Sequence, residues 1–398
     1  MKLIHCLALS WICIISAEYV DIIQEYRDTG DANFPEYIAV SFNMNAGQVS
    51  IRAFRNLHVP KEIPVFVGSS QGTNLWVETK DQSLEEAYLS LLPKAAFIVK
   101  EVTGSNVNRK FAFKGTFEFG GEVYSITPHE GDIVDRTVLP NSLRVANRHM
   151  VQRLDATELP NKPFDILSGV SNSAQDGTNG DQNIQPRRQK REARYHKIFY
   201  TTETLVVADY PVFQKIYSLK SDKNDIDCYD ETVRQIKSFI TEVINGVDMR
   251  FMAINDSQSV FSTKLAGIFI ATTAGAAPPK GPTVNGGQQA ESFLKSFSDW
   301  LEPLNTVLIP FDYAVMFTED DLTGTLGNSI VGAGVANAMC SDRSNGIVRY
   351  FDSFSSSQAT THLLAQAMGA KRDGVDNTCQ DGTSYIMSPR AAPRSQSV

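Results

Sequence analysis

The stretch over residues 168–186 constrains the fold most strongly, because it divides the chain into two parts with different patterns of apolar residues. It is rich in Gly, Ser, Asn and Asp and poor in apolar residues, a composition typical of a linker. The chain has 398 residues, which is also more than one ordinary core accommodates. We therefore expect two or three domains, with this linker as one boundary.

Ahead of the linker, residues 18–167 alternate short apolar runs with turn formers. The runs at residues 37–42, 64–67 and 111–119 have the length and content of β-strands. Residues 83–92 are the best candidate for a helix. The pattern predicts a mostly β domain over residues 18–167.

Residues 68–72, Gly-Ser-Ser-Gln-Gly, match the Gly-x-Ser-x-Gly pattern of serine hydrolases. That nucleophile elbow needs a strand before the serine and a helix after it. Here strand-like residues stand on both sides, at 64–67 and at 74–78. A hairpin loop is therefore the better interpretation.

Beyond the linker, strand-like and helix-like segments alternate. Residues 204–207, 266–271 and 312–317 have the character of strands, and residues 229–244 and 291–301 have helical apolar spacing. Such alternation is typical of an α/β or α+β domain. The chain as a whole is thus expected to be α+β, with a mostly β part followed by an α/β part over residues 192–398.

The N-terminus has the pattern of a secretory signal peptide. Lys2 precedes an apolar run over residues 3–15, and the small residues Ser16 and Ala17 follow it. A membrane anchor needs roughly 20 apolar residues, and neither this run nor any later stretch is long enough. We expect residues 1–17 to be removed and the product to be secreted, soluble and without a membrane span.

Net charge limits the choice of partners. The formal charge is −8 at pH 7, so the chain offers no broad basic surface for nucleic acid. Because the product is expected outside the cell, extracellular proteins are the expected partners. The sequence does not predict an oligomeric state.

A basic run, Arg-Arg-Gln-Lys-Arg, follows the linker at residues 187–191. Basic runs are usually solvated surface. In a secreted chain, however, Arg188, Lys190 and Arg191 have the spacing that proprotein convertases favour, on an extended segment that suits an acidic protease pocket. We expect cleavage after Arg191, which would release residues 18–191 as a propeptide.

Three cysteines lie beyond the predicted signal peptide: Cys228, Cys340 and Cys379. An odd number in an oxidising compartment leaves one thiol without a partner, unless it bonds to another chain or its partner is missing from this sequence. Asn255 begins an Asn-Asp-Ser triplet, which is an N-glycosylation acceptor in a secreted protein.

The residues that bear most directly on function follow residue 355. Ser355 and Gln358 make a plausible capping box for a helix that continues over residues 360–368. Within that helix His362 and Gln366 are four residues apart and would share one face.

This arrangement resembles the adamalysin/reprolysin branch of the metzincin zinc proteases. The signature of that family is His-Glu-x-x-His-x-x-Gly-x-x-His-Asp, followed by a Met-turn. His362 falls on the first ligand position and Gly369 on the glycine that breaks the helix. Asp373 falls on the Asp after the third ligand, and Met387 on the methionine of the Met-turn.

The resemblance extends over residues 195–389, with similar stretches at residues 204–209, 312–314 and 335–348. Residues 39–42 and 121–128 resemble the propeptide of the family. The likeness is to the short secreted members found in arthropod saliva or venom. Compared with them, the chain lacks a C-terminal helix and a cysteine that pairs with the Cys340 position, so the protease-like domain is expected to lack its C-terminal part.

Three positions depart from the signature. Leu363 stands where the family has its general-base Glu, Gln366 at the second ligand position and Arg372 at the third. A catalytic zinc needs three protein ligands and one open position. An amide oxygen is a poor ligand, and a guanidinium is permanently positive with no free lone pair.

Loss of the base at Leu363 alone typically lowers a rate by ~10²–10⁴-fold. The departures therefore predict no zinc or other cofactor and no catalysis, so that the protein would act by protein binding. His362 would then be a packed helix residue, and Met387 would fill a core gap.

Two alternatives stay open. One is a weak zinc metalloendopeptidase that uses Gln366 or a carboxylate such as Asp373 as ligand and acts on extracellular host or matrix proteins. The other is that only the propeptide acts, in trans, on active relatives of the chain.

Overall fold

The computed structural model describes residues 17–27, 34–60, 62–76, 85–102, 111–129, 148–154, 164–167, 197–220, 225–254, 256–304, 308–380 and 385–388. Residues 1–16 of the predicted signal peptide, the linker, the predicted convertase site with Arg188, Lys190 and Arg191, and Asn255 lie outside these residues.

Most of the N-terminal part forms a nine-stranded antiparallel sheet in the order β1-β11-β10-β9-β8-β7-β4-β3-β2. Its inner face carries a core rich in aromatic side chains, among them Phe97, Phe113 and Phe117. The strands are β1 Ala17–Asp21, β2 Ile23–Arg27, β3 Tyr37–Met44, β4 Gly47–Arg55, β7 Glu85–Leu91, β8 Lys94–Glu101, β9 Phe111–Phe119, β10 Glu122–Pro128 and β11 Arg148–Arg153.

The helix predicted over residues 83–92 is wrong, because this segment is strand β7 between β4 and β8. Both faces of the strand are covered. Tyr88 belongs to the core of the nine-stranded sheet, while Ala87 packs in the core cluster of the second sheet. A strand buried on both faces loses its apolar–polar alternation, so periodicity cannot distinguish it from a buried helix.

A second sheet has eight strands in the order β12-β20-β21-β17-β13-β14-β5-β6. Neighbours run parallel except at β20–β21 and β5–β6. The strands are β5 Val65–Ser69, β6 Gly72–Trp76, β12 Phe164–Leu167, β13 Ile198–Ala208, β14 Ser259–Ala271, β17 Tyr313–Thr318, β20 Gly332–Val335 and β21 Asn345–Arg349. A small sheet contains β15 Thr283–Val284, β16 Gly287–Gln289, β18 Leu322–Thr323 and β19 Ser329–Ile330.

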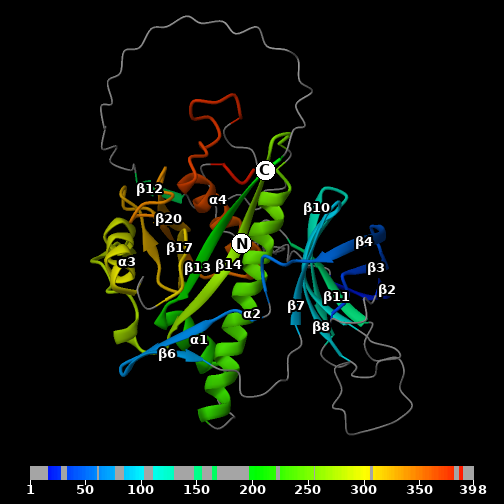
Figure 1. Cartoon of the computed structure of the whole chain (residues 1–398), viewed down its shortest axis with the longest axis horizontal. Helices are drawn as coiled ribbons and strands as arrows, with labels where there is room; N and C mark the ends of the chain where they lie inside the picture. The colour runs from blue at the N-terminus through cyan, green and yellow to red at the C-terminus, as the bar shows by residue number, and fades with distance from the viewer. Residues whose placement is uncertain are drawn as a thin grey trace, which may run out of the picture.

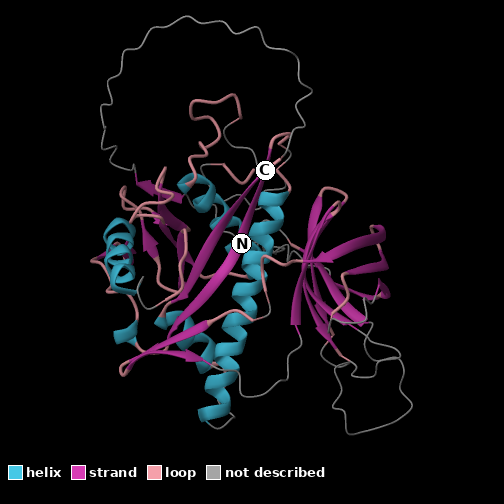
Figure 2. Ribbon diagram, viewed as in Figure 1, coloured by secondary structure: helices cyan, strands magenta, loops and turns pink. Residues whose placement is uncertain are grey.

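Helices cover both faces of the eight-stranded sheet (Figure 2). Val206 points into the cluster formed with α1, α2 and α4, whereas Leu205 and Val207 point into the cluster formed with α3. This alternation is what a strand produces when its two faces meet different layers. The helices are α1 Tyr210–Ser218, α2 Asp225–Met252, α3 Ala290–Leu304 and α4 Ser353–Ala367, with a 3-10 turn, η2, at Ala274–Ala276. The expected α+β class is confirmed in this coarse form.

Three strands of the eight-stranded sheet come from residues that precede the linker. β5 and β6 form an antiparallel hairpin beside β14, and β12 lies at the opposite edge beside β20 (Figure 1). The hairpin interpretation of residues 68–72 is therefore correct. The sheets do not follow the boundary drawn at the linker, and the division into propeptide and protease-like domains stays a prediction.

Helix α2 lies between the two sheets (Figure 1). Its residues Ile240 and Val247 pack in the cluster of the eight-stranded sheet. Met249 instead contacts Leu89 and Ala96, which belong to β7 and β8. Within the described residues, none of the helices has the length and hydropathy that a bilayer span needs. The three cysteines beyond the N-terminus are free thiols, with Cys228 buried and the other two exposed.

Candidate functional site

Helix α4 carries the first part of the candidate site. Asp352 caps its N-terminus, with the side chain accepting a hydrogen bond from Ser355 N at 2.9 Å. The predicted capping box at Ser355 and Gln358 is therefore wrong, because the helix begins two residues earlier, at Ser353. Gly369 follows the helix with a φ of 102°, a left-handed conformation that suits glycine at a helix end.

His362 is packed and almost fully buried, with 1% of its surface exposed. Its Nδ1 lies 2.6 Å from the carbonyl oxygen of Ile386, and its ring stacks on Phe164 with centroids 4.0 Å apart and planes 13° apart. Nε2 has no hydrogen-bond partner. Burial, aided by the nearby positive charge of Arg372, lowers the pKa of His362 to about 4, so the imidazole is neutral at physiological pH.

Gln366 lies one turn along the same helix, with 3% of its surface exposed. Its Oε1 is buried and has no hydrogen-bond partner. Arg372 donates from Nη2 to the carbonyl oxygen of Phe164 at 3.0 Å. The amide nitrogen of Asp373 donates to the carbonyl oxygen of Met387 at 3.0 Å, which ties the segment after α4 to the predicted Met-turn.

Leu363 is a core residue. It is 1% exposed and its side chain lies over glycines of the sheet. A Cβ at Gly346 would come within 3.3 Å of Leu363 Cδ1, and so would one at Gly332. The position of the missing base is therefore filled by an aliphatic side chain that packs against bare backbone, where nothing can accept a proton.

Strand β12 completes the site. It pairs in parallel with β20, from Phe164 opposite Gly332 to Leu167 opposite Val335. Phe164 is a site residue that the sequence does not predict. No local signal marks it, because its contact with His362 joins residues 198 positions apart in sequence.

These residues do not fit a catalytic zinc. His362 offers one free imidazole nitrogen, but Gln366 offers an amide and Arg372 a cation that already binds a backbone carbonyl. No group of three His, Cys, Asp or Glu side chains that could hold a metal ion occurs among the described residues. The positive charge beside His362 also opposes a dication at that point.

Comparison with known proteins places the site in a family. Residues 219–397 match the model of the Reprolysin (M12B) family zinc metalloproteases. Among solved structures, archaemetzincin from Methanopyrus kandleri is similar over 48% of this chain and 83% of that chain, with 13% sequence identity and a TM-score of 0.28. No curated protein matches the chain. The matched residues include α4, Leu363, Gln366 and Arg372, so the candidate site lies in the part of the chain that is similar to the reprolysin-type metalloproteases.

Proposed function

We propose that this chain is a secreted, catalytically inactive member of the reprolysin family. In this proposal it acts by binding an extended segment of an extracellular protein along strand β20. The observation that carries the proposal is the pairing of β12 with β20. This extended segment places the aromatic ring of Phe164 on His362.

The chemistry around His362 supports the lack of catalysis. Family members are zinc metalloproteases, and zinc in such sites supplies a nucleophilic water and polarises the scissile carbonyl. The amide of Gln366 and the guanidinium of Arg372 are unsuited to hold it. Leu363 is buried among glycines of the sheet, so the proton transfer expected of a general base has no acceptor at that position.

The pairing of β12 supports binding as the retained function. Strand β12 spans only Phe164–Leu167, so an extended peptide that displaces it from β20 would gain the same kind of main-chain hydrogen bonds, and side-chain pockets would provide specificity. Here the specificity element is the stacked ring of Phe164, held also by the bond from Arg372 to its carbonyl. The residues that have replaced the catalytic set thus form part of a binding surface.

Secretion is supported by the sequence of residues 1–17, with its charged start, short apolar run and small-residue end. The alternative of a weak zinc endopeptidase would require Gln366 and a carboxylate to join His362 around one ion. Burial lowers the pKa of His362 and the cation of Arg372 lowers it further, and this positive charge weighs against that arrangement.

A competition experiment tests the binding surface. The full chain carrying Phe164→Ala loses the anchor of its own strand, so β20 becomes available to a peptide added in trans. A fluorescent peptide with the sequence of residues 161–170 should bind this variant roughly tenfold or more tightly than it binds the unaltered chain, as measured by anisotropy.

The matched control is the same peptide with Ala at the Phe164 position, which should bind the variant roughly tenfold more weakly. A chelator should leave the affinity of both peptides unchanged. Equal affinity of the two peptides, or no binding of either, would contradict the proposed surface. Binding that disappears with the chelator would favour the zinc-dependent alternative.

A further inference from the structure

Strand β5, from the N-terminal part, is built into the sheet of the protease-like part. It runs parallel to β14, from Val65 opposite Ile268 to Gly68 opposite Ala271. Val65 and Val67 are 2% and 6% exposed and belong to the main core cluster of that sheet. The contact is therefore a shared hydrogen-bond ladder with a shared core.

Steric fit at this contact is close. A Cβ added at Gly68 would lie 2.5 Å from Cζ of Phe269 and 3.1 Å from Cβ of Ala276. The strand approaches β14 so closely that only glycine fits at this point. Such complementarity is typical of permanent interiors.

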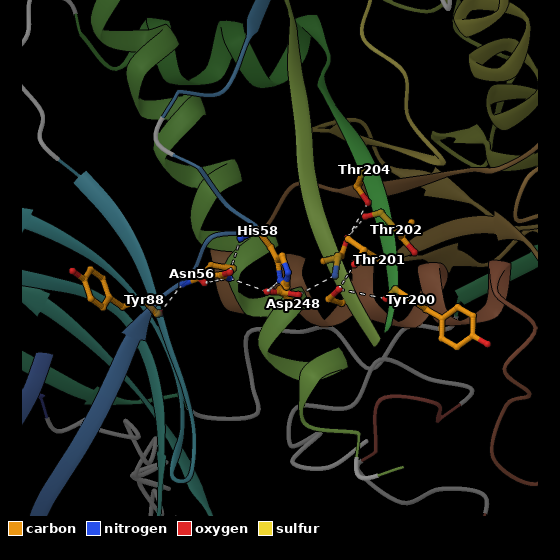
Figure 3. A network of polar contacts seen from close by, with 11 residues as sticks. Asn56, His58, Tyr88, Tyr200, Thr201, Thr202, Thr204 and Asp248 are labelled. Carbon is orange, nitrogen blue, oxygen red and sulfur yellow. Dashed lines mark hydrogen bonds and ion pairs between the residues drawn. The ribbon is translucent and has the colours of Figure 1, made fainter. Parts of the chain in front are cut away.

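The segment between β4 and β5 forms a buried polar network with α2 (Figure 3). Asp248 is fully buried, and its carboxylate lies 2.9 Å from Asn56 Nδ2 and 3.0 Å from His58 Nδ1. The other carboxylate oxygen accepts a hydrogen bond from Thr263 N at 2.9 Å. Two of these three partners come from the N-terminal part.

Asn245 of α2 makes a second set of contacts with the nine-stranded sheet. Its Nδ2 donates to the carbonyl oxygens of Tyr88 and Phe97 at 2.9 and 3.1 Å. Its Oδ1 accepts from Asn56 at 2.9 Å. The side chain is 1% exposed, so its polar groups are satisfied by the N-terminal part within the interior.

Departure of the N-terminal part would have two costs. It would expose the apolar face of β14 and α2, and it would leave the carboxylate of Asp248 without two of its partners. Removing the partners of a buried charge is strongly unfavourable. The four-residue strand β12, in contrast, is a short segment at the opposite edge.

We propose that cleavage after Arg191 does not release the N-terminal part, and that the processed protein is a lasting non-covalent complex of residues 18–191 with residues 192–398. The N-terminal part is then a structural subunit that completes the sheet beside β14. This inference goes beyond the proposed function, because it holds whether or not the site at His362 binds zinc or peptides.

The test is a native pull-down of the cut protein. The full chain carries an affinity tag at its C-terminus and a recognition sequence for a site-specific viral protease in place of residues 172–178, so that cutting does not depend on a convertase. After complete cleavage at about 1 μM, the N-terminal fragment should stay bound in stoichiometric amount through dilution and washing. Only denaturant should separate the two fragments.

Two variants and a control locate the contact. Val67→Asp places a charge in the shared core, and Asn56→Ala removes the bonds to Asn245 and Asp248. Cut Asn56→Ala protein should lose its N-terminal fragment at least roughly fivefold faster than the unaltered protein. Cut Val67→Asp protein should lose it still faster. Leu75→Asn, at a position of β6 that is 58% exposed, should behave like the unaltered protein.

Release of the N-terminal fragment from the unaltered cut protein during washing would overturn the proposal, whether or not the remaining fragment stays folded. If Val67→Asp protein is not secreted, Asn56→Ala alone decides the location of the contact. Equal retention in Asn56→Ala and unaltered protein would show that the polar network does not hold the fragments together.

Discussion

The buried imidazole of His362 makes a quantitative prediction about stability and pH. In the folded protein its pKa is lowered to about 4 by burial and by the nearby cation, against about 6.5 in an unfolded chain. Between these two values the unfolded chain binds a proton that the folded protein does not. Because the pKa of His362 is lower in the folded protein than in the unfolded chain, the folded protein becomes less stable as the pH falls below 6.5.

At about pH 5, linkage between these two pKa values makes the folded state less stable by about 2 kcal/mol than at about pH 8, from this residue alone. His362→Phe keeps an aromatic ring against Phe164 and removes the titrating group. The variant loses the bond to Ile386 at every pH, so its stability relative to the unaltered chain should improve by about 2 kcal/mol between pH 8 and pH 5.

Urea denaturation at the two pH values measures how the difference in unfolding free energy between the variant and the unaltered chain changes with pH. Other titrating groups, including buried Asp209, whose pKa burial raises to about 7, are common to both proteins and cancel. Thr360→Val is the matched control, since Thr360 is fully buried on the same helix and does not titrate, and its effect should be the same at both pH values. If His362→Phe instead changes the unfolding free energy by the same amount at both pH values, the imidazole of His362 is not held buried and neutral in the folded protein.

Three further predictions concern the interior and the site. Gly68→Ala should destabilise the chain by about 1–3 kcal/mol, because the new Cβ overlaps a buried ring, whereas Gly275→Ala, in open space, should stay within about 0.5 kcal/mol in thermal unfolding. The hydrogen bond to the buried carboxylate of Asp248 raises the pKa of His58, although burial and a nearby lysine lower it. The cut fragments should therefore separate faster at about pH 8.5 than at about pH 6, and His58→Gln should remove that difference in the pull-down. The double change Gln366→His and Arg372→His supplies two further imidazoles, and metal analysis should find zinc bound stoichiometrically, still without peptide cleavage, because the base is absent. A metal-free double variant would show that the scaffold no longer presents the three positions together.

The elements that could be predicted from sequence are those with a strong local pattern. The strand expected at residues 204–207 lies in the C-terminal half of β13, and the helix expected at residues 229–244 is the middle of α2. Helix α2 has regular apolar spacing, whereas residues 204–207 are a short apolar run with two valines, a composition that favours a strand even though both of its faces are buried. The actual elements are longer than predicted, because contacts across the sheet continue beyond the periodic residues.

What could not be predicted depends on contacts between distant residues. The apolar run of strand β7 predicts a helix wrongly, because both faces of the strand are buried. Phe164 reaches His362 only through the pairing of β12 with β20. The replacements at Leu363 and Gln366 are visible in the sequence, but their burial and the missing partner of the amide oxygen are visible only in the structure.

The lack of a catalytic zinc centre is the core of the proposed function. The most direct measurement is metal analysis of the purified, secreted protein, combined with an assay of peptide cleavage with and without a chelator. A chain without a catalytic zinc centre should contain zinc far below one ion per chain and show no cleavage that a chelator abolishes. One zinc per chain, with cleavage that stops on chelation and returns when zinc is restored, would contradict it.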